Sequence, residues 1–215
     1  MIVYGSSISP FVRKVLAFGA EKGLELEHRP IGLGSDDPDF LEASPFRKMP
    51  GFTDGDFRIC DSSAIVHYLE AKYPEPPLIP AEPRARARTI WFDEFGDTIL
   101  MGCGRTMFFN RIVAPRFLGR PGDLDAADKA ETEELPPILD YLERVAPEAG
   151  GFLVGDSITL ADIAVASPFA NLSYVGVTVD PARYPKAAAY VGSVLGRPSF
   201  ASWVERERAF LSKAA

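Results

Sequence analysis

The sequence predicts a chain with an α/β first part and an all-helical second part, and three observations carry this prediction. Short β-like runs alternate with helical runs over roughly the first eighty residues. Segment 74–83 contains five prolines, which cannot continue a helix and behave as a stiff connector. Beyond it the strand signals largely stop and long helical segments follow. We therefore expect one domain over residues 1–79 and a second, all-helical domain over residues 84–215.

The elements of the first part follow the order β-α-β-α-β-β-α, which is typical of a mixed sheet with helices on its faces. Asp54-Gly55 separates the last two strands and predicts a type I′ hairpin turn, because both central residues of that turn need positive φ. The expected strands cover residues 2–4, 24–31, 51–53 and 57–60, and the expected helices cover 10–22, 38–43 and 62–73.

The second part reads as a helix bundle, with helices expected at 84–110, 125–145, 159–174, 185–195 and 200–213. Pro136-Pro137 should kink or divide the second of these helices. Thr159 and Asp162 have the spacing of a capping box, in which each side chain satisfies a backbone donor of the other's turn. Ile158 and Ile163 fall at the positions of a hydrophobic staple. We interpret this helix start as a folding device.

Charge and composition exclude several classes of partner. The formal net charge of -7 argues against nucleic acid and anionic membranes, because phosphate binding needs clustered Lys and Arg. No apolar run approaches the length of a membrane span, and the N-terminal residues lack the pattern of a signal peptide, so we expect a cytoplasmic protein. Cys60 and Cys103 have no metal-type or CxxC spacing, and His28 and His67 are isolated, so no metal site is expected.

One candidate for chemistry is the turn before the first helix. Ser9 stands at the N-cap position, with Pro10 at the first helical position, where a missing N–H is harmless. Its hydroxyl can cap the helix, or it can face a thiolate beside the positive helix terminus.

Two further segments can bind an extended ligand. If the bond before Pro50 is cis, the N–H and C=O of Met49 can turn outward to pair with such a ligand, and an ordinary loop proline is the alternative. Asp61 and Ser62 open a helix and are common capping residues. They can equally form a clamp in which Ser62 takes a carboxylate and Asp61 takes an ammonium group.

In this order and spacing, the three segments resemble the cytosolic glutathione S-transferase superfamily over essentially the whole chain. Ser-Pro-Phe-Val-Arg-Lys-Val at 9–15 is similar to the catalytic turn of its serine-type, bacterial-like members. Lys48-Met49-Pro50 resembles the family's Lys-Val-Pro, whose proline is cis, and Asp61-Ser62 resembles its Glu-Ser pair. The segment 155–163 is similar to the family's bundle-core signature.

The resemblance implies a thioredoxin-like α/β N-terminal domain that binds glutathione, followed by an all-α helical bundle that borders the electrophile site. It implies a glutathione transferase that uses the thiol as a thiolate against a hydrophobic electrophile, with glutathione as co-substrate and a homodimeric assembly. Ser9 becomes the expected catalytic residue, with Ser6 in reserve. The expected glutathione-binding residues are Lys48, Met49, Pro50, Asp61 and Ser62, and the expected electrophile pocket contains Phe11, Met107, Phe108 and Arg111.

Some interpretations remain open at the level of sequence. Arg47 stands where the family has glycine, and Tyr4 is expected in the core. Met107 and Phe108 can belong to a buried stripe, and Arg111 can pair with a surface acid. A glutathione-dependent isomerase or an aryl-ether-cleaving enzyme would use the same thiolate. A non-catalytic, partner-binding protein of the same fold is the remaining alternative.

Overall fold

A four-stranded mixed sheet forms the centre of the first eighty residues. In the computed structural model, which describes residues 1–148 and 150–213, the strands are β1 (Ile2–Tyr4), β2 (Glu27–Arg29), β3 (Gly51–Asp54) and β4 (Phe57–Cys60). Their order in the sheet is β2-β1-β3-β4. β1 pairs in parallel with β2 and antiparallel with β3, which in turn pairs antiparallel with β4. This is the thioredoxin-like arrangement expected from the sequence.

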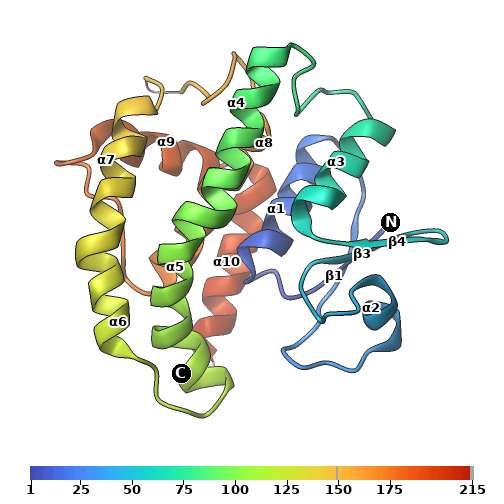
Figure 1. Cartoon of the computed structure of the whole chain (residues 1–215), viewed down its shortest axis with the longest axis horizontal. Coiled ribbons are helices and arrows are strands. Elements are labelled where there is room, and N and C mark those ends of the chain that lie inside the picture. Colours follow the sequence, from blue (N-terminus) through green and yellow to red (C-terminus); the bar gives the residue numbers. More distant parts are fainter. Residues whose placement is uncertain (149, 214–215) are drawn as a thin grey trace. The chain divides into compact units, whose positions relative to one another are not determined.

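Three helices accompany this sheet: α1 (Pro10–Glu21), α2 (Pro38–Ala43) and α3 (Ser62–Lys72) (Figure 1). α1 joins the parallel strands β1 and β2, as a crossover helix must. Its Val12, Val15 and Leu16 are buried, and Ile65, Val66 and Leu69 of α3 are buried as well. Tyr4 is 2% exposed and belongs to a core cluster with Ile31, Phe40 and Ala43, so its expected core position is confirmed.

Two expectations for the sheet were wrong in detail. β2 covers only Glu27–Arg29 instead of 24–31, because its partner β1 offers three residues for pairing. The hairpin loop consists of Gly55 and Asp56, since Asp54 pairs with Phe57 as the last rung of the ladder. Gly55 has φ 63°, while Asp56 is not among the residues with positive φ. Positive φ at the first central residue alone fits a type II′ turn and excludes the predicted type I′ turn.

The proline-rich segment is anchored to α1 and α3 within the first unit. Lys22 Nζ donates to the carbonyl oxygen of Pro76 at 2.7 Å and forms a 2.8 Å ion pair with Glu70. The carboxylate of Glu70 also accepts hydrogen bonds from the backbone N–H groups of Leu78 and Ile79. This connector is therefore held by a buried lysine and a carboxylate in addition to its own stiffness.

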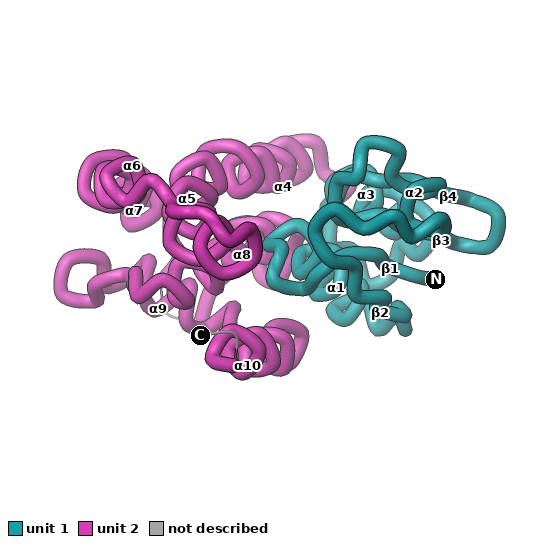
Figure 2. Tube along the Cα trace, turned by 90° about the horizontal axis from the view of Figure 1, so that it is seen from below, with its two compact units in different colours: residues 1–80 teal, residues 81–215 magenta. Residues whose placement is uncertain are grey.

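The regular secondary structure of the remaining described residues is helical, and the chain divides into two compact units, Met1–Pro80 and Ala81–Ala215, which Figure 2 colours separately. The last two residues of the expected second domain, 214 and 215, lie outside the described residues. The α-helices of the second unit are α4 (Pro83–Glu94), α5 (Met101–Phe108), α6 (Leu124–Lys129), α7 (Leu135–Val145), α8 (Leu160–Tyr174), α9 (Pro185–Leu195) and α10 (Pro198–Lys213).

Wider, π-helical turns interrupt the two longest expected helices. The segment predicted as one helix over 84–110 comprises α4, η1 (Phe95–Leu100), α5 and η2 (Phe109–Phe117). The segment predicted over 125–145 comprises α6, η3 (Ala130–Glu134) and α7. Pro136 and Pro137, which were expected to kink or divide this helix, lie in the first turn of α7, directly after η3, so the helix continues through this point and changes from π-helical to α-helical turns there. Such π-helical turns often occur at functional sites.

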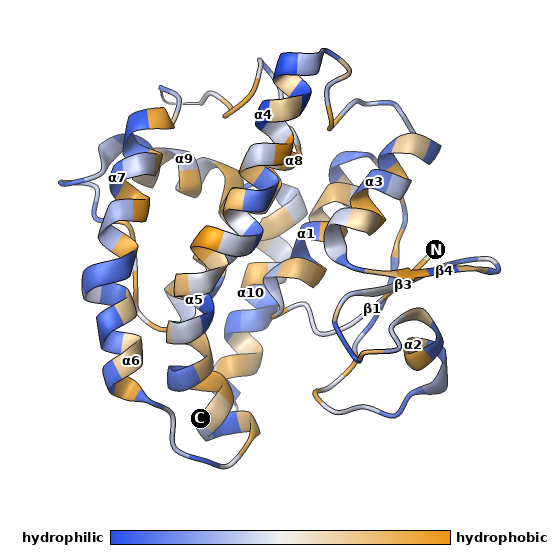
Figure 3. Cartoon of the chain, in the orientation of Figure 1, coloured by the Kyte–Doolittle hydropathy of each residue, from blue (hydrophilic) through white to orange (hydrophobic). Residues whose placement is uncertain are grey.

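Helix α8 forms the centre of the second unit. Every residue from Leu160 to Leu172 is buried, as expected of a helix that is apolar on all sides. The outer helix α7 instead buries Leu135, Leu139 and Leu142 at helical spacing, and Figure 3 shows the corresponding mixture of hydrophobic and hydrophilic positions. No helix within residues 1–148 and 150–213 combines the length and the hydropathy of a membrane span.

The predicted capping box at the start of α8 is confirmed. Asp162 is fully buried, and its carboxylate accepts hydrogen bonds from the N–H of Thr159 at 2.8 Å, the N–H of Leu153 at 2.8 Å and the hydroxyl of Tyr190 at 2.9 Å. Burial raises the pKa of Asp162, while these donors act in the opposite direction. This carboxylate thus joins a loop, a helix start and α9.

Candidate functional site

Ser9 occupies the N-cap position of α1, yet its side chain does not cap the helix. Its backbone has the extended conformation expected there, with φ -66° and ψ 123°, and Pro10 follows at the first helical position. The side chain makes no capping hydrogen bond, and no other hydrogen bond of the Ser9 hydroxyl occurs among the described residues. This partly buried hydroxyl is therefore available to a ligand beside the positive end of a twelve-residue helix.

Gly5 brings the Ser6–Ser9 turn against Met49. Gly5 has φ 139°, and an added Cβ would lie 2.6 Å from Val12 and 3.1 Å from Met49. The backbone N–H of Ser6 lies 3.4 Å from the sulfur of Met49, and the N–H of Ser9 donates to the carbonyl of Ser6. The first two predicted segments are therefore in contact.

The peptide bond between Met49 and Pro50 is cis, as the resemblance implied. Pro50 is buried and directly precedes β3, which is an interior strand of the sheet, so the proline lies outside the ladder. Lys48 is exposed and Met49 is partly buried. The loop before them is fixed by buried Ser44, whose hydroxyl donates to the Lys48 carbonyl at 2.6 Å and accepts from the Lys48 N–H at 2.9 Å.

Strand pairing brings the third segment next to the second. Gly51 pairs with Cys60, so Pro50 and Asp61 stand immediately beyond the same rung of the ladder. Asp61 has φ 79° and ψ 127°, a region that residues other than glycine rarely occupy and that is common at ligand-binding sites. The structure thus gathers the predicted Ser9, Met49-Pro50 and Asp61-Ser62 segments on one unit.

The expected capping role of Asp61 is confirmed. Its Oδ1 accepts hydrogen bonds of 3.0 Å from the N–H groups of both Ser63 and Ala64. The residue is exposed, and no hydrogen bond or ion pair of its Oδ2 is found in the described part of the chain. Ser62, in the first position of α3, is 3% exposed. A capping Oδ1 leaves the second oxygen for a ligand cation, so the two predicted roles of Asp61 are compatible.

Two supporting residues received no role in the sequence analysis: Lys14, which lies inside the motif at 9–15, and His28, which was noted only as an isolated histidine. Lys14 is 1% exposed, and its Nζ donates a 3.1 Å hydrogen bond to Ser63 Oγ beside the clamp. His28 Nε2 lies 2.8 Å from the carbonyl oxygen of Gly5 and holds the end of β1. The sequence signal that could have identified Lys14 is its position. It is a basic residue on the inner face of a helix, where apolar residues are expected.

Arg47 occupies the left-handed region, with φ 56°, which accounts for the glycine found there in the family. Its guanidinium forms a 2.7 Å ion pair with Asp36. The charge that Arg47 adds to this loop is therefore balanced locally.

The residues expected in the electrophile pocket belong to different elements. Phe11 lies partly buried on α1, and Met107 on α5 is fully buried in the second unit. Phe108, also on α5, has its ring centroid 6.5 Å from that of Tyr174.

Arg111 pairs with surface acids, as the sequence allowed. Its Nη2 contacts Asp128 at 2.7 Å and Glu131 at 2.6 Å. Burial alone would lower the pKa of Arg111, but hydrogen bonds to these two carboxylates raise it above its usual value.

The cysteines differ in environment. Burial, assisted by the negative charge of Glu134, raises the pKa of the Cys103 thiol to about 11, and Cys60 is partly exposed. Within the described residues, no group of three or more metal-ligating side chains is close enough to hold an ion.

Comparison with known proteins agrees with this geometry. Residues 3–77 match the family model of the glutathione S-transferase N-terminal domain, and residues 118–207 match that of the glutathione S-transferase C-terminal domain. The chain is 31% identical to glutathione S-transferase 3 of Zea mays, over 94% of this chain and 86% of the relative. It is 29% identical to a glutathione S-transferase of Hyoscyamus muticus, over 95% of this chain and 98% of the relative.

The solved structures include a glutathione S-transferase from Rhodospirillum rubrum F11 that superposes with a TM-score of 0.85. It is 25% identical to this chain, and the match covers 98% of this chain and 99% of the other. The α/β unit, the helical unit and the matching family models agree in order along the sequence. The chain therefore belongs to the glutathione S-transferase family.

Proposed function

We propose that the protein is a glutathione transferase in which the Ser9 hydroxyl donates a hydrogen bond to the thiolate of glutathione. The observation that carries this proposal is a serine at the N-cap of α1 whose side chain does not cap the helix. Ser6, whose side chain also makes no hydrogen bond among the described residues, is the second candidate. Ser9 is favoured because it adjoins the helix terminus, where a negative charge is stabilised.

The Ser9 hydrogen bond and the end of α1 are strong enough to ionise the thiol of glutathione. A thiol with a pKa of about 8.5 is only a few per cent ionised at neutral pH, and lowering it by about two units requires about 2.7 kcal/mol. A hydrogen bond to a charged group contributes about 1.5–3 kcal/mol, and a helix N-terminus contributes about 0.3–1 kcal/mol. One serine hydroxyl and the end of α1 can therefore make the thiolate the major form without an enzyme base.

The rest of glutathione fits the other two segments. The backbone N–H and C=O of Met49 are proposed to pair with the cysteinyl backbone, and exposed Lys48 supplies a positive charge nearby. At the γ-glutamyl end, the Ser62 N–H and hydroxyl take the carboxylate at the start of α3, and Asp61 Oδ2 takes the ammonium group. The chemistry of the cysteinyl and γ-glutamyl parts of the tripeptide thus matches the residues that this unit offers.

The thiolate attacks an electrophilic carbon of a hydrophobic second substrate. A carbon–sulfur bond forms, the leaving group departs with its electron pair, and the thiol proton has already passed to solvent. Phe11 and Phe108 are the proposed contacts of the electrophile. Met107 and Arg111 remain in the proposal, although Met107 is buried and Arg111 is paired with two carboxylates.

We further propose the serine-type, bacterial-like subclass, a two-fold dimer and a cytoplasmic location. The subclass rests on the motif at 9–15, whose serine precedes proline at the helix start. The dimer and the location rest on the resemblance to the family. Light scattering tests the assembly, and a monomer at micromolar concentration would overturn this part of the proposal.

The test of the function combines binding and turnover. The protein should be retained on immobilised glutathione and should conjugate glutathione to chlorodinitrobenzene. Retention without turnover of any member of a panel of activated halides, epoxides and enones would favour a partner-binding protein. Turnover restricted to aryl ethers or isomerisable double bonds would favour the alternative enzymes. Failure to bind glutathione at all would overturn the proposal.

A further inference from the structure

The peptide group between Gly5 and Ser6 joins strand β1 to the turn that carries both candidate serines. Its carbonyl oxygen, which belongs to Gly5, lies 2.8 Å from Nε2 of His28. Its N–H, which belongs to Ser6, lies 3.4 Å from the sulfur of Met49. Because a peptide group is planar, a partner on one side of it also fixes the direction of the other side. The orientation of this one peptide therefore depends on His28 and Met49 together.

Gly5 by itself does not hold this peptide in place. Its φ of 139° lies in a region that side chains rarely adopt, and glycine has the greatest backbone freedom of all residues. An added Cβ would lie only 2.6 Å from Val12, so a side chain at this position cannot restrict the backbone instead. The Gly5 N–H donates to the carbonyl of Arg29 at 3.1 Å, which fixes the amino side of the residue. The direction of the Gly5 carbonyl is then set by the partners of the following peptide.

His28 is well placed to act as that partner. It is the central residue of β2 and pairs with Val3, so the sheet fixes its backbone, and its side chain is partly buried. A carbonyl oxygen only accepts hydrogen bonds, so this contact assigns the hydrogen to Nε2 of the imidazole. Both the neutral Nε2–H tautomer and the imidazolium carry that hydrogen. The contact therefore needs no particular charge state of His28.

The peptide that His28 holds leads directly into the turn before α1. The Ser6 carbonyl accepts a 3.0 Å hydrogen bond from the N–H of Ser9. The Ser9 carbonyl in turn accepts one of 3.0 Å from the N–H of Arg13, inside α1. A rotation of the Gly5–Ser6 peptide would therefore move the backbone that carries the Ser9 hydroxyl. A displacement of about 1 Å in a reacting group can lower a rate about 10²-fold, so small movements of this turn matter.

We propose that His28 is a positioning residue for the Ser9 hydroxyl. It fixes the plane of the Gly5–Ser6 peptide, and through this peptide it sets the distance from the Ser9 hydroxyl to the thiolate of bound glutathione. The inference rests on the proposed function, and it adds a residue of β2 to the three segments that are proposed to bind glutathione. A purely structural histidine would affect the stability of the sheet and leave the pKa of the bound thiol unchanged.

The test compares His28→Leu, which lacks a donor, with His28→Gln, whose side-chain amide can donate from about the position of Nε2. The thiolate absorbance of the glutathione complex, titrated well below the melting temperature, gives the pKa of the bound thiol. His28→Leu should raise this pKa by about one unit and lower kcat/KM about tenfold, whereas His28→Gln should stay within about twofold of the wild type. His67→Leu removes the other histidine of the chain, from α3 of the same unit, and should change neither value.

A second measurement needs no glutathione. Hydrogen exchange of the Ser6 amide, followed by NMR in the ligand-free protein, should be about tenfold faster in His28→Leu than in the wild type, because the Gly5 carbonyl and the Ser6 N–H share one plane. His28→Gln should restore the slow exchange. If His28→Leu does not fold, His28→Met takes its place as a variant without a donor.

The proposal is overturned if the variant without a donor keeps the lowered thiol pKa, or if its Ser6 amide exchanges at the wild-type rate. It is also overturned if His28→Gln loses as much thiolate as that variant, since the hydrogen bond would then play no part. A wild-type protein that does not bind glutathione would instead overturn the proposed function. The exchange of the Ser6 amide would then decide alone whether His28 holds the turn.

Discussion

The ammonium group of Lys14 on α1 donates a hydrogen bond of 3.1 Å to the Ser63 hydroxyl on α3, and both residues lie in the same unit. Lys14 is 1% exposed, so this contact joins, inside the unit, the helix that begins at Ser9 and the helix that begins at Ser62. We infer that Lys14 is a positioning residue for the clamp.

Replacing Lys14 tests this role. Lys14→Met keeps the apolar stem but removes the donor and the charge beside the clamp, so KM for glutathione should rise about tenfold while kcat changes less than twofold. Lys14→Arg retains both properties and should restore most of the affinity. Steady-state kinetics well below the melting temperature provide the measurement. Equal KM values for Met and Arg variants would mean that Lys14 serves the fold alone.

Arg47 has a left-handed backbone, which predicts that a glycine variant at this position is more stable than an alanine variant. Arg47→Gly and Arg47→Ala both remove the ion pair with Asp36, and they differ in tolerance of φ 56° and in the entropy of the unfolded chain. The glycine variant should be more stable by about 1 kcal/mol in urea unfolding, because relief of the left-handed strain exceeds the extra entropy of the unfolded chain.

The same pair of substitutions at exposed Arg86, inside helix α4, is the matched control. There alanine should exceed glycine by about 1 kcal/mol. The same order of stability at both positions would contradict the account of Arg47.

Among the acidic residues of the helical unit, Asp162 is expected to cause the largest loss of stability when it is replaced. Asp162→Ala leaves the N–H groups of Leu153 and Thr159 and the Tyr190 hydroxyl without their acceptor, so the free energy of unfolding should fall by about 3 kcal/mol or more. Asp156→Ala removes an exposed carboxylate from the same segment and should change it by less than about 0.5 kcal/mol. Similar losses in the two variants would argue against the buried network.

Acid should weaken the attachment of the β3–β4 hairpin to α3. Hydrogen bonds from Lys72 and Tyr68 lower the pKa of Asp54 below its ordinary 3.8. Between the lowered folded pKa and 3.8, the unfolded chain binds more protons, so stability from this group rises with pH. That contribution is complete above the unfolded pKa and is lost as the pH falls through the folded one.

The measurement compares the unfolding free energies of the wild-type protein and Asp54→Asn from about pH 6 down to about pH 3. The difference between them should be constant at the upper end and should shrink once the pH drops below about 4. A difference that grows on acidification would have the wrong sign for an ionised Asp54.

The sequence predicted the part of the site that depends on local chemistry. Pro10, Asp61 and Thr159 define helix starts through their own side chains, and all three helices begin within one residue of the expected position. The residues around Pro50 left the isomer open, and the cis bond found there was implied by the resemblance of Lys48-Met49-Pro50 to the family's motif.

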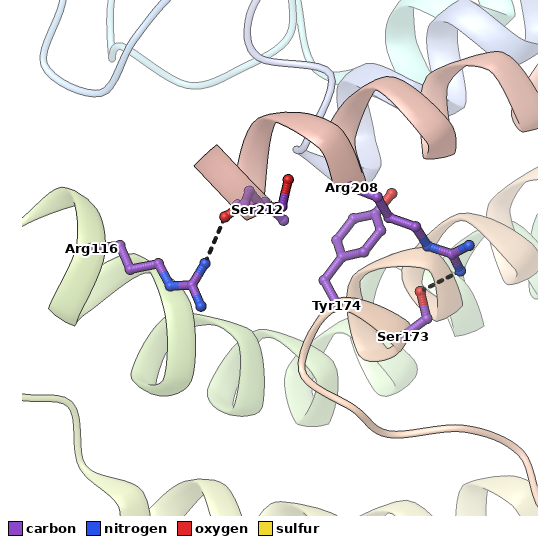
Figure 4. Close-up of a pocket in the computed structure, with 6 residues that line it drawn as sticks. Arg116, Ser173, Tyr174, Arg208 and Ser212 are labelled. Atoms are coloured by element: carbon purple, nitrogen blue, oxygen red, sulfur yellow. Dashed lines mark hydrogen bonds between the residues drawn. The ribbon is translucent and has the colours of Figure 1, made fainter. Parts of the chain in front are cut away.

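The remaining features depend on partners distant in sequence. β2 is short because β1 is short, and the burial of Lys14 depends on Ser63, forty-nine positions away. The π-helical turns in 84–117 escaped prediction because apolar spacing does not distinguish a wide turn from an α-helical turn. Arg116 and Arg208, which line a common pocket of the second unit (Figure 4), carry no motif, since η2 and α10 bring them together from distant positions.

The most direct test of the central claim is a pH titration of the thiolate absorbance of glutathione bound to the wild-type protein, Ser9→Ala and Ser6→Ala. In the wild-type complex, the pKa of the glutathione thiol should lie about two units below that of free glutathione. The Ser6→Ala complex should show the same lowered pKa. Ser9→Ala should still bind glutathione but titrate close to the free thiol. A lowered pKa that survives in Ser9→Ala and disappears in Ser6→Ala would assign the role to the other serine and contradict the account given for Ser9.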